Sequence, residues 1–141
     1  MDFSTTIRKK IVLFDIDWVL AKMREDYSFT HDGSEDVIHI NKLLLSLLSL
    51  HSKETMVEVV LLTWREESTR EVTVNWLSRY GIEYSKLIMK LTPKWNNAAF
   101  KSETIRSLSF ESDILLVVDD NPAVLDICKS MRIPFCLFFN N

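Results

Sequence analysis

The sequence predicts an α/β domain with a mostly parallel sheet and helices on both faces. Apolar segments of strand length alternate with segments of helical periodicity in the order βαβαβαβαβ along the 141 residues. Two of the strand-length segments end in paired acids. Such alternation is typical of parallel sheets, in which ligands bind beyond the carboxyl ends of the strands. We therefore expect one domain, residues 1–141, with a site at that edge of the sheet.

The first strand is expected from Ile11, where the run IVLFDID is continuously apolar up to its acids. Residues 18–36 mix aromatic, charged and turn residues, which predicts a flap rather than a core element. From 37 to about 51 apolar residues recur at helical spacing. The stretch LLLSLLSL at 43–50 is much shorter than a membrane span and predicts one buried helix.

The second strand is expected at 56–63, where MVEVVLLT is nearly all apolar. A helix from about Glu66 to Tyr80 should follow, because acids occupy its first turn and Gly81 provides a stop. The segment KLIM at 86–89 suits a short third strand.

The last part of the chain repeats the alternation. Residues 98–108 have helical character, and DILLVVDD at 113–120 predicts the fourth strand. Asn121 and Pro122 then begin a helix with proline at an early position. The run IPFCLFF at 133–139 supplies a fifth strand.

Composition is that of an ordinary globular chain, with 47% hydrophobic residues, 26% charged residues and a net charge of −3. This charge excludes a whole-domain basic footprint, so any nucleic-acid contact must be local. Cys128 and Cys136 lack metal-site or disulfide spacing and are expected as small core residues in a reducing compartment. No secretion signal is visible at the start of the chain, and we expect a cytoplasmic, intracellular protein without a membrane partner.

Paired acids at two strand ends carry the chemistry. Asp15 and Asp17 can lean toward one crevice while Ile16 turns into the core. Asp119 and Asp120 end the fourth strand in the same way, so neighbouring strands would bring the carboxylates together. Mg²⁺ is the expected counter-ion, because it is a hard cation that prefers oxygen ligands. Each acid alone is equally explained as a solvated strand end, but two pairs favour a metal site.

The series DIDWVL at 15–20, LLT ending at Thr63, Lys101 and VVDD ending at Asp120 resembles the four motifs of the haloacid dehalogenase superfamily, in order and spacing, over nearly the entire chain. The resemblance implies a three-layer Rossmann-like fold with a five-stranded, mainly parallel sheet in the order 3-2-1-4-5. Residues 18–36 would form a minimal cap. It also implies a Mg²⁺-dependent phosphatase.

The resemblance assigns roles to the acids. Asp15 would be the nucleophile that forms an aspartyl-phosphate. Asp17 would be the general acid and base, and its backbone carbonyl would help to hold the metal. Asp120 would bind Mg²⁺ directly, with Asp119 supporting the metal or the lysine.

Two further motif residues would contact the phosphoryl group. Thr63 would hydrogen-bond a phosphoryl oxygen, and Lys101 would neutralise charge on the nucleophile and the transferred group. Taken alone, Thr63 is an ordinary strand residue and Lys101 an ordinary surface charge. Lys90 and Lys94 stay open as alternatives to Lys101.

Within the superfamily, the chain most resembles the 3′-phosphatase domain of bacteriophage-type polynucleotide kinase/phosphatase. The resembling segments are DIDWVLAKM at 15–23, VIHIN at 37–41, TWREEST at 63–69 and the run 87–101. This resemblance implies release of phosphate from 3′-phosphorylated DNA or RNA ends. No G-x-x-x-x-G-K-[ST] loop is present in the sequence, so 5′-kinase activity is not expected.

The narrower resemblance implies that Arg65 and Lys90 lie near the substrate phosphate or its nucleic-acid tail. With Lys94 and Lys101 they would form a local positive rim, beside which Trp64 or Trp95 would offer a face for a base to stack on. The ordinary interpretation is a helix-start charge for Arg65, a surface lysine for Lys90 and a core residue for Trp64.

One departure from the family concerns Trp18, which stands where glycine is usual, so a tight turn must be built with a large side chain.

Two other functions remain open. The same chemistry would serve nucleotides, other small metabolites or phosphoproteins, since the motifs specify phosphoryl transfer and not the leaving group. A non-catalytic binding module with this fold is the third hypothesis. The oligomeric state is left open.

Overall fold

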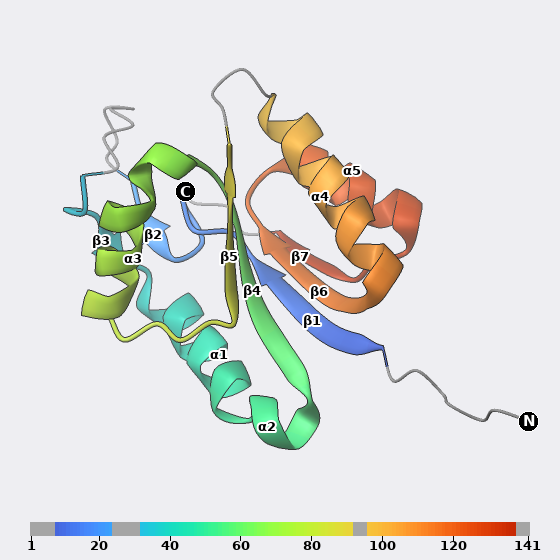
Figure 1. Cartoon of the computed structure of the whole chain (residues 1–141), viewed down its shortest axis with the longest axis horizontal. Coiled ribbons are helices and arrows are strands. Elements are labelled where there is room, and N and C mark those ends of the chain that lie inside the picture. Colours follow the sequence, from blue (N-terminus) through green and yellow to red (C-terminus); the bar gives the residue numbers. More distant parts are fainter. Residues whose placement is uncertain (1–7, 24–31, 92–95, 138–141) are drawn as a thin grey trace, which may run out of the picture.

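The computed structural model of the chain describes residues 8–23, 32–91 and 96–137. Its centre is a five-stranded sheet made of β1 (Lys9–Phe14), β4 (Val57–Glu66), β5 (Lys86–Lys90), β6 (Ser112–Asp119) and β7 (Phe135–Leu137). The strands lie in the order β5-β4-β1-β6-β7, and every pairing between neighbours is parallel (Figure 1). The predicted α/β class with a mostly parallel sheet is confirmed.

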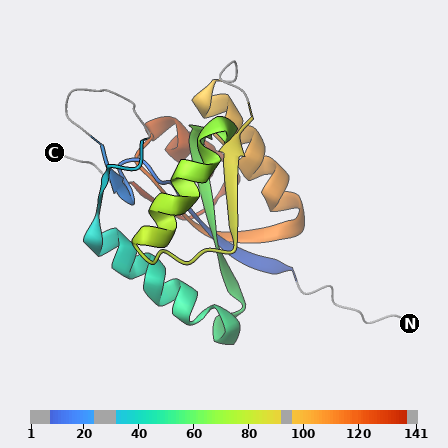
Figure 2. The ribbon, with the colours of Figure 1, turned by 60° about the vertical axis from the view of Figure 1, so that its left-hand side comes forward.

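Helices cover both faces of this sheet (Figures 1 and 2). One face carries α1 (His39–Leu50), the short α2 (Ser52–Thr55) and α3 (Arg70–Arg79), and the other carries α4 (Asn97–Glu111) and α5 (Pro122–Met131). Alternate residues of the strands face opposite sides, so each face has its own core. Val12 and Phe14 pack with Trp76 in the core on the α3 face. Ile11 packs with Ile105 in the core on the α4 face. The sheet and the helices on its two faces form three layers.

Several element boundaries differ from the sequence prediction. The second strand of the sheet continues to Glu66, and α3 begins only at Arg70, after the 3-10 turn η1 (Glu67–Thr69). The pairing of β4 with β5 shifts register between Leu62 and Glu66, so the residues between them bulge from the ladder. α4 extends beyond the predicted 98–108 at both ends, and Asn96 caps its start by accepting hydrogen bonds from the backbone N–H groups of two following residues.

The prediction that residues 43–50 form a buried helix is wrong. The helix exists as α1, but only Asn41 and Leu45 within it are buried. A helix that lies on one face of a sheet buries a single stripe, and α1 is apolar on two sides. Its outer side therefore leaves five large apolar side chains exposed: Ile40, Leu43, Leu44, Leu47 and Leu50.

The expected excursion after β1 contains two short strands. β2 (Ala21–Lys22) and β3 (Asp36–Val37) pair in antiparallel fashion beside the main sheet, and residues 24–31 between them lie outside the described residues. No described helix has the length and apolar character that crossing a bilayer requires.

The chain turns sharply between β1 and β2, at the position of Trp18. Trp18 has a φ of 66°, in the left-handed region, and the Ile16 carbonyl accepts hydrogen bonds from the N–H groups of Val19, Leu20 and Ala21. A non-glycine residue in this region costs on the order of 1 kcal/mol. The predicted tight turn with a large side chain is confirmed.

Candidate active site

Neighbouring strands bring the acids together at the carboxyl edge of the sheet. β1 lies between β4 and β6, and Phe14, its last residue, is level with Val118 of β6 and Leu61 of β4. The Asp15 N–H donates to the Val118 carbonyl at 2.9 Å, which continues the ladder by one residue. Asp15 and Asp119 are the next residues after the paired Phe14 and Val118, so they lie side by side at the ends of neighbouring strands.

A buried lysine joins these two acids. Lys101 projects from α4, and its Nζ lies 3.1 Å from Asp15 Oδ1 and donates to Asp119 Oδ2 at 2.6 Å. The backbone N–H of Asn121 donates to the other Asp119 oxygen at 2.9 Å. Asp119 is thus held from both sides and fixes the lysine against Asp15. The structure places Lys101, and not Lys90, against the carboxylates.

The cluster is largely buried and contains more carboxylates than positive charges, and both features shift the pKa values of its members. Burial and the neighbouring acids raise the pKa of Asp15 well above the ordinary value of 3.8, although Lys101 opposes the rise. Burial likewise raises the pKa of the partly buried Asp120. For Lys101 burial acts to lower the pKa, but Asp15 and Asp119 outweigh it and raise the pKa above 10.5. The ammonium stays charged, while the carboxylates outnumber it.

The cluster fits a divalent cation. Asp15, Asp119 and Asp120 each offer an oxygen, and these oxygens all lie within 4.8 Å of one another. Asp15 Oδ2 is buried and accepts no hydrogen bond from the described residues. A buried carboxylate oxygen without a donor is costly unless a cation satisfies it. Mg²⁺ takes oxygen ligands of this kind, with waters completing its shell.

Asp17 has a different partner from Asp15. The Arg65 guanidinium forks onto its carboxylate, with Nε at 3.1 Å and Nη2 at 2.6 Å from Oδ1, and both residues are buried. The remaining nitrogen, Nη1, donates to Thr73 Oγ1 at 3.1 Å. A fork of this type holds a carboxylate in one orientation. The Asp17 side chain contributes no oxygen to the cluster of three acids, although its backbone carbonyl stays a predicted metal ligand.

Glu35 is the residue that sequence reasoning missed. It lies just before β3, is 7% exposed, and its Oε1 is 3.5 Å from Arg65 Nη2. Neither of its carboxylate oxygens accepts a hydrogen bond from the described residues. Arg65 is thus shared between an acid of the turn after β1 and an acid of the flap. Glu35 belongs to the segment 18–36 that the sequence predicts as a flap, and nothing in that segment's sequence signals a buried carboxylate.

The predicted positive rim is wrong for the residues that the structure describes. Arg65, Lys90 and Lys101 are all buried, because each is engaged by a partner within the fold. Lys90 Nζ donates to Asn97 Oδ1 at 2.7 Å and lies 5.9 Å from the centroid of the Trp64 ring. Lys94 and Trp95 lie outside the described residues.

Thr63 and Trp64 occupy the bulged end of β4. Thr63 is fully buried, and its hydroxyl accepts a hydrogen bond from the Arg65 N–H at 3.1 Å. Its strand is next to β1, so Thr63 ends at the same edge as Asp15. Trp64 is partly buried, with the Lys90 ammonium over its ring.

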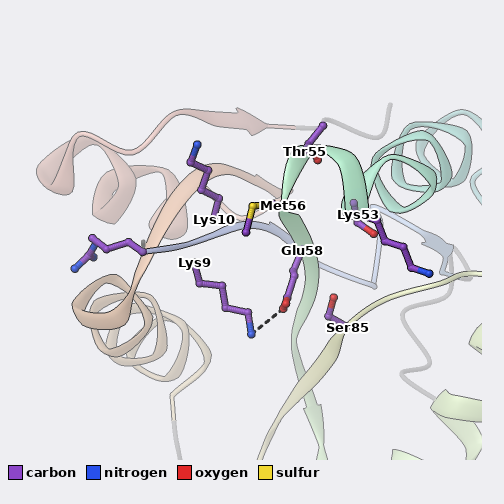
Figure 3. Close-up of a pocket in the computed structure, with 9 residues that line it drawn as sticks. Lys9, Lys10, Lys53, Thr55, Met56, Glu58 and Ser85 are labelled. Carbon is purple, nitrogen blue, oxygen red and sulfur yellow. Dashed lines mark ion pairs between the residues drawn. The ribbon is translucent and has the colours of Figure 1, made fainter. Parts of the chain in front are cut away.

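A separate hollow of about 550 Å³ lies at the opposite edge, where the strands begin (Figure 3). Lys9, Lys10 and Lys53 line it, and Lys9 pairs there with Glu58 at 2.9 Å. The length of β1, roughly 20 Å for six residues, separates this hollow from the carboxylates. It does not belong to the candidate active site.

Comparisons with known proteins agree with this arrangement. No family model and no curated protein matches the sequence. Among solved structures, a chain from the Pnkp1/Rnl/Hen1 complex matches with a TM-score of 0.80 and 22% identity over 94% of this chain, and the class C acid phosphatase from Bacillus anthracis with tungstate bound matches with a TM-score of 0.70 and 14% identity over 96%. The chain therefore shares the fold of these structures, which is consistent with the haloacid dehalogenase-like fold that the sequence resemblance implies.

The matches differ in how much of the other protein they cover. This chain spans 47% of the matched chain in the Pnkp1/Rnl/Hen1 complex, and 68% of the acid phosphatase. A second structure, of the Pnkp1/Rnl/Hen1 RNA repair complex, matches with a TM-score of 0.79 over 43% of its chain. The shared fold therefore covers about half of each matched chain from the Pnkp1/Rnl/Hen1 structures.

Proposed function

We propose that the protein is a Mg²⁺-dependent phosphomonoesterase, folded as one domain over residues 1–141, in which Asp15 attacks phosphorus. The supporting observation is the meeting of Asp15, Asp119 and Asp120 with Lys101 at the carboxyl edge of the sheet. Mg²⁺ held by Asp15, Asp120 and the Asp17 carbonyl would supply positive charge to the phosphoryl oxygens.

Asp15 and Lys101 act in both steps of the proposed reaction. The Asp15 carboxylate forms a bond to phosphorus as the bond from phosphorus to the leaving oxygen breaks, which gives an aspartyl-phosphate. Water then attacks phosphorus, the bond to Asp15 breaks, and inorganic phosphate leaves. Lys101 neutralises charge on Asp15 and the transferred group, and Asp119 keeps the lysine in place.

Asp17 is proposed as the general base of the second step and the general acid of the first. The Arg65 fork favours its ionised state, which is the state that accepts a proton from water. In the first step Asp17 must instead be protonated, because it donates a proton to the leaving oxygen. Asp17→Asn should therefore slow hydrolysis of alkyl phosphates, whose leaving oxygen needs a proton, far more than hydrolysis of p-nitrophenyl phosphate. Equal losses on both substrates would contradict the acid role.

The proposed substrate is a 3′-phosphate at a DNA or RNA end. Support comes from the sequence resemblance at 15–23 and 63–69, and from the shared fold with a chain of an RNA repair complex. In this proposal the buried Arg65 and Lys90 and the partly buried Trp64 orient groups near the phosphate rather than form an exposed rim. Opening of 2′,3′-cyclic ends belongs to the same proposal and is measured in the same assay.

A matched panel tests the substrate class. Phosphate release with Mg²⁺ is measured from one oligonucleotide carrying a 3′-phosphate, the same oligonucleotide carrying a 5′-phosphate, and a 3′-mononucleotide. We expect the 3′-phosphorylated oligonucleotide to be preferred. If only mononucleotides or sugar phosphates are hydrolysed, a small-molecule phosphatase becomes the better assignment. Turnover of none of them, nor of p-nitrophenyl phosphate, would favour a binding module, which the strained turn at Trp18 also motivates.

A further inference from the structure

The outer side of α1 is an apolar stripe that no described element covers. Its members are exposed to 70% (Ile40), 54% (Leu43), 38% (Leu44), 49% (Leu47) and 72% (Leu50). At 3.6 residues per turn they fall within an arc of about 120° along the helix. We call these five residues the α1 stripe. In Figures 1 and 2 α1 lies at the periphery, with no other described helix or strand on its outer side.

The helix does not need the α1 stripe to dock on its own domain. Its opposite side already does so, because Leu45 is fully buried, Leu48 packs against the core and Asn41 Nδ2 donates to the Val19 carbonyl at 2.7 Å. A surface helix usually carries polar residues away from the core. The α1 stripe is therefore an excess of apolar surface that packing among the described residues does not explain.

The size of the α1 stripe suits an interface. Five aliphatic side chains with these exposures present roughly 500 Å², near the upper end of the patches found on monomers. Other exposed large apolar residues in the described chain, such as Leu91, Phe110 and Leu115, come from separate elements. Pairing two copies of the α1 stripe would bury about 1,000 Å² in total, the lower bound for a specific interface.

The charge of α1 favours a second copy of this chain as the occupant. Lys42 is the sole Asp, Glu, Lys or Arg residue in the helix, and the helical period places it away from the α1 stripe. Two-fold pairing sets the same patch against itself, which a uniformly charged patch would oppose and an uncharged one allows. Leucine ridges of two antiparallel helices can then interdigitate.

We propose that two copies of this chain form a two-fold dimer through the α1 stripe. The proposal does not rest on the phosphatase assignment, because the Asp15 cluster is complete within one chain. Each copy keeps its own carboxylates at the edge of its own sheet. Dimerisation and hydrolysis are therefore separable by mutation.

Sedimentation velocity of the full chain over a wide concentration range tests this. Wild-type protein should reach twice the monomer mass of 16.5 kDa. The double variant Leu43→Glu with Leu47→Glu should stay at the monomer mass, with its far-UV circular dichroism unchanged because both side chains are already half exposed. If the charged pair fails to fold, Leu43→Ser with Leu47→Ser makes the same test.

Phe110→Glu is the matched control, since Phe110 is 81% exposed on α4, across the sheet from α1. It should dimerise as wild type does. A wild-type monomer at every concentration overturns the proposal. So does a folded double variant that still dimerises, or a Phe110→Glu variant that does not.

Discussion

Two buried charge clusters follow β1, one around Asp15 and one around Asp17, and they are balanced differently. Asp15 shares its site with two further acids and a single ammonium, and one of its oxygens accepts no hydrogen bond from the described residues. Asp17 receives a forked guanidinium, with Glu35 as the second acid on that Arg65. The comparison indicates that the first cluster can take up more positive charge, whereas the second holds an acid in place.

The largest expected effect is that of Asp15→Asn. The neutral amide is a poor nucleophile, so phosphate release should fall by about a thousandfold or more. Stability without metal should not fall, because the substitution removes a buried charge that its neighbours disfavour. Activity assays and urea denaturation of the same preparation measure both effects. Retained turnover would remove Asp15 from the mechanism.

Replacing the positively charged side chain of each cluster should show the difference between the two clusters. Lys101→Met and Arg65→Met each leave buried carboxylates uncompensated, which costs about 3–5 kcal/mol of unfolding free energy. Mg²⁺ should restore stability to Lys101→Met more than to Arg65→Met, because only the first cluster gathers three acids. The measurement is thermal unfolding with and without Mg²⁺. Equal rescue of both variants would contradict the difference drawn between the clusters.

Lys53→Met is the control for that pair, since Lys53 is exposed on α2, away from both clusters. Its unfolding free energy should change by less than about 0.5 kcal/mol.

Stabilisation by Mg²⁺ should depend on pH. The pKa values of Asp15 and Asp120 are raised above 3.8, so the folded protein binds more protons than the unfolded chain in the window above 3.8. Without metal, stability should therefore fall as pH rises through that window. Mg²⁺ binds ionised carboxylates, so the rise in Tm that it causes should grow over the same window. A metal effect that is constant with pH would count against these ligands.

Among the substitutions within the two clusters, Glu35→Gln should have the smallest effect. Its carboxylate lies at 3.5 Å from Arg65 and accepts no hydrogen bond from the described residues, so the amide loses only a long ion pair. We expect a change in unfolding free energy within about 1 kcal/mol. Urea denaturation beside Asp17→Asn measures it, and a larger loss in Glu35→Gln than in Asp17→Asn would reverse the order of the two acids on Arg65.

The fold class and the position of the acids at strand ends were predictable from strand periodicity, because apolar runs that end in acids place Asp15 and Asp119 at the carboxyl ends of parallel strands. Periodicity does not say which strands are neighbours, so the meeting of the two acids and Lys101 was predictable only from the superfamily resemblance. The pairing of Asp17 with Arg65 was not predictable, because it depends on a bulge at the end of β4 and on side chains 48 residues apart. Leucine periodicity in α1 indicated a helix correctly but could not tell which of its two apolar sides the sheet covers.

The most direct measurement looks for phosphate on Asp15. Wild-type protein is mixed with Mg²⁺ and a 3′-phosphorylated oligonucleotide, quenched in acid during turnover, digested and analysed by mass spectrometry. We predict a phosphorylated peptide that contains Asp15, absent without Mg²⁺ and absent in Asp15→Asn. Steady release of phosphate with Asp15 unmodified, or continued release by Asp15→Asn, would contradict the account.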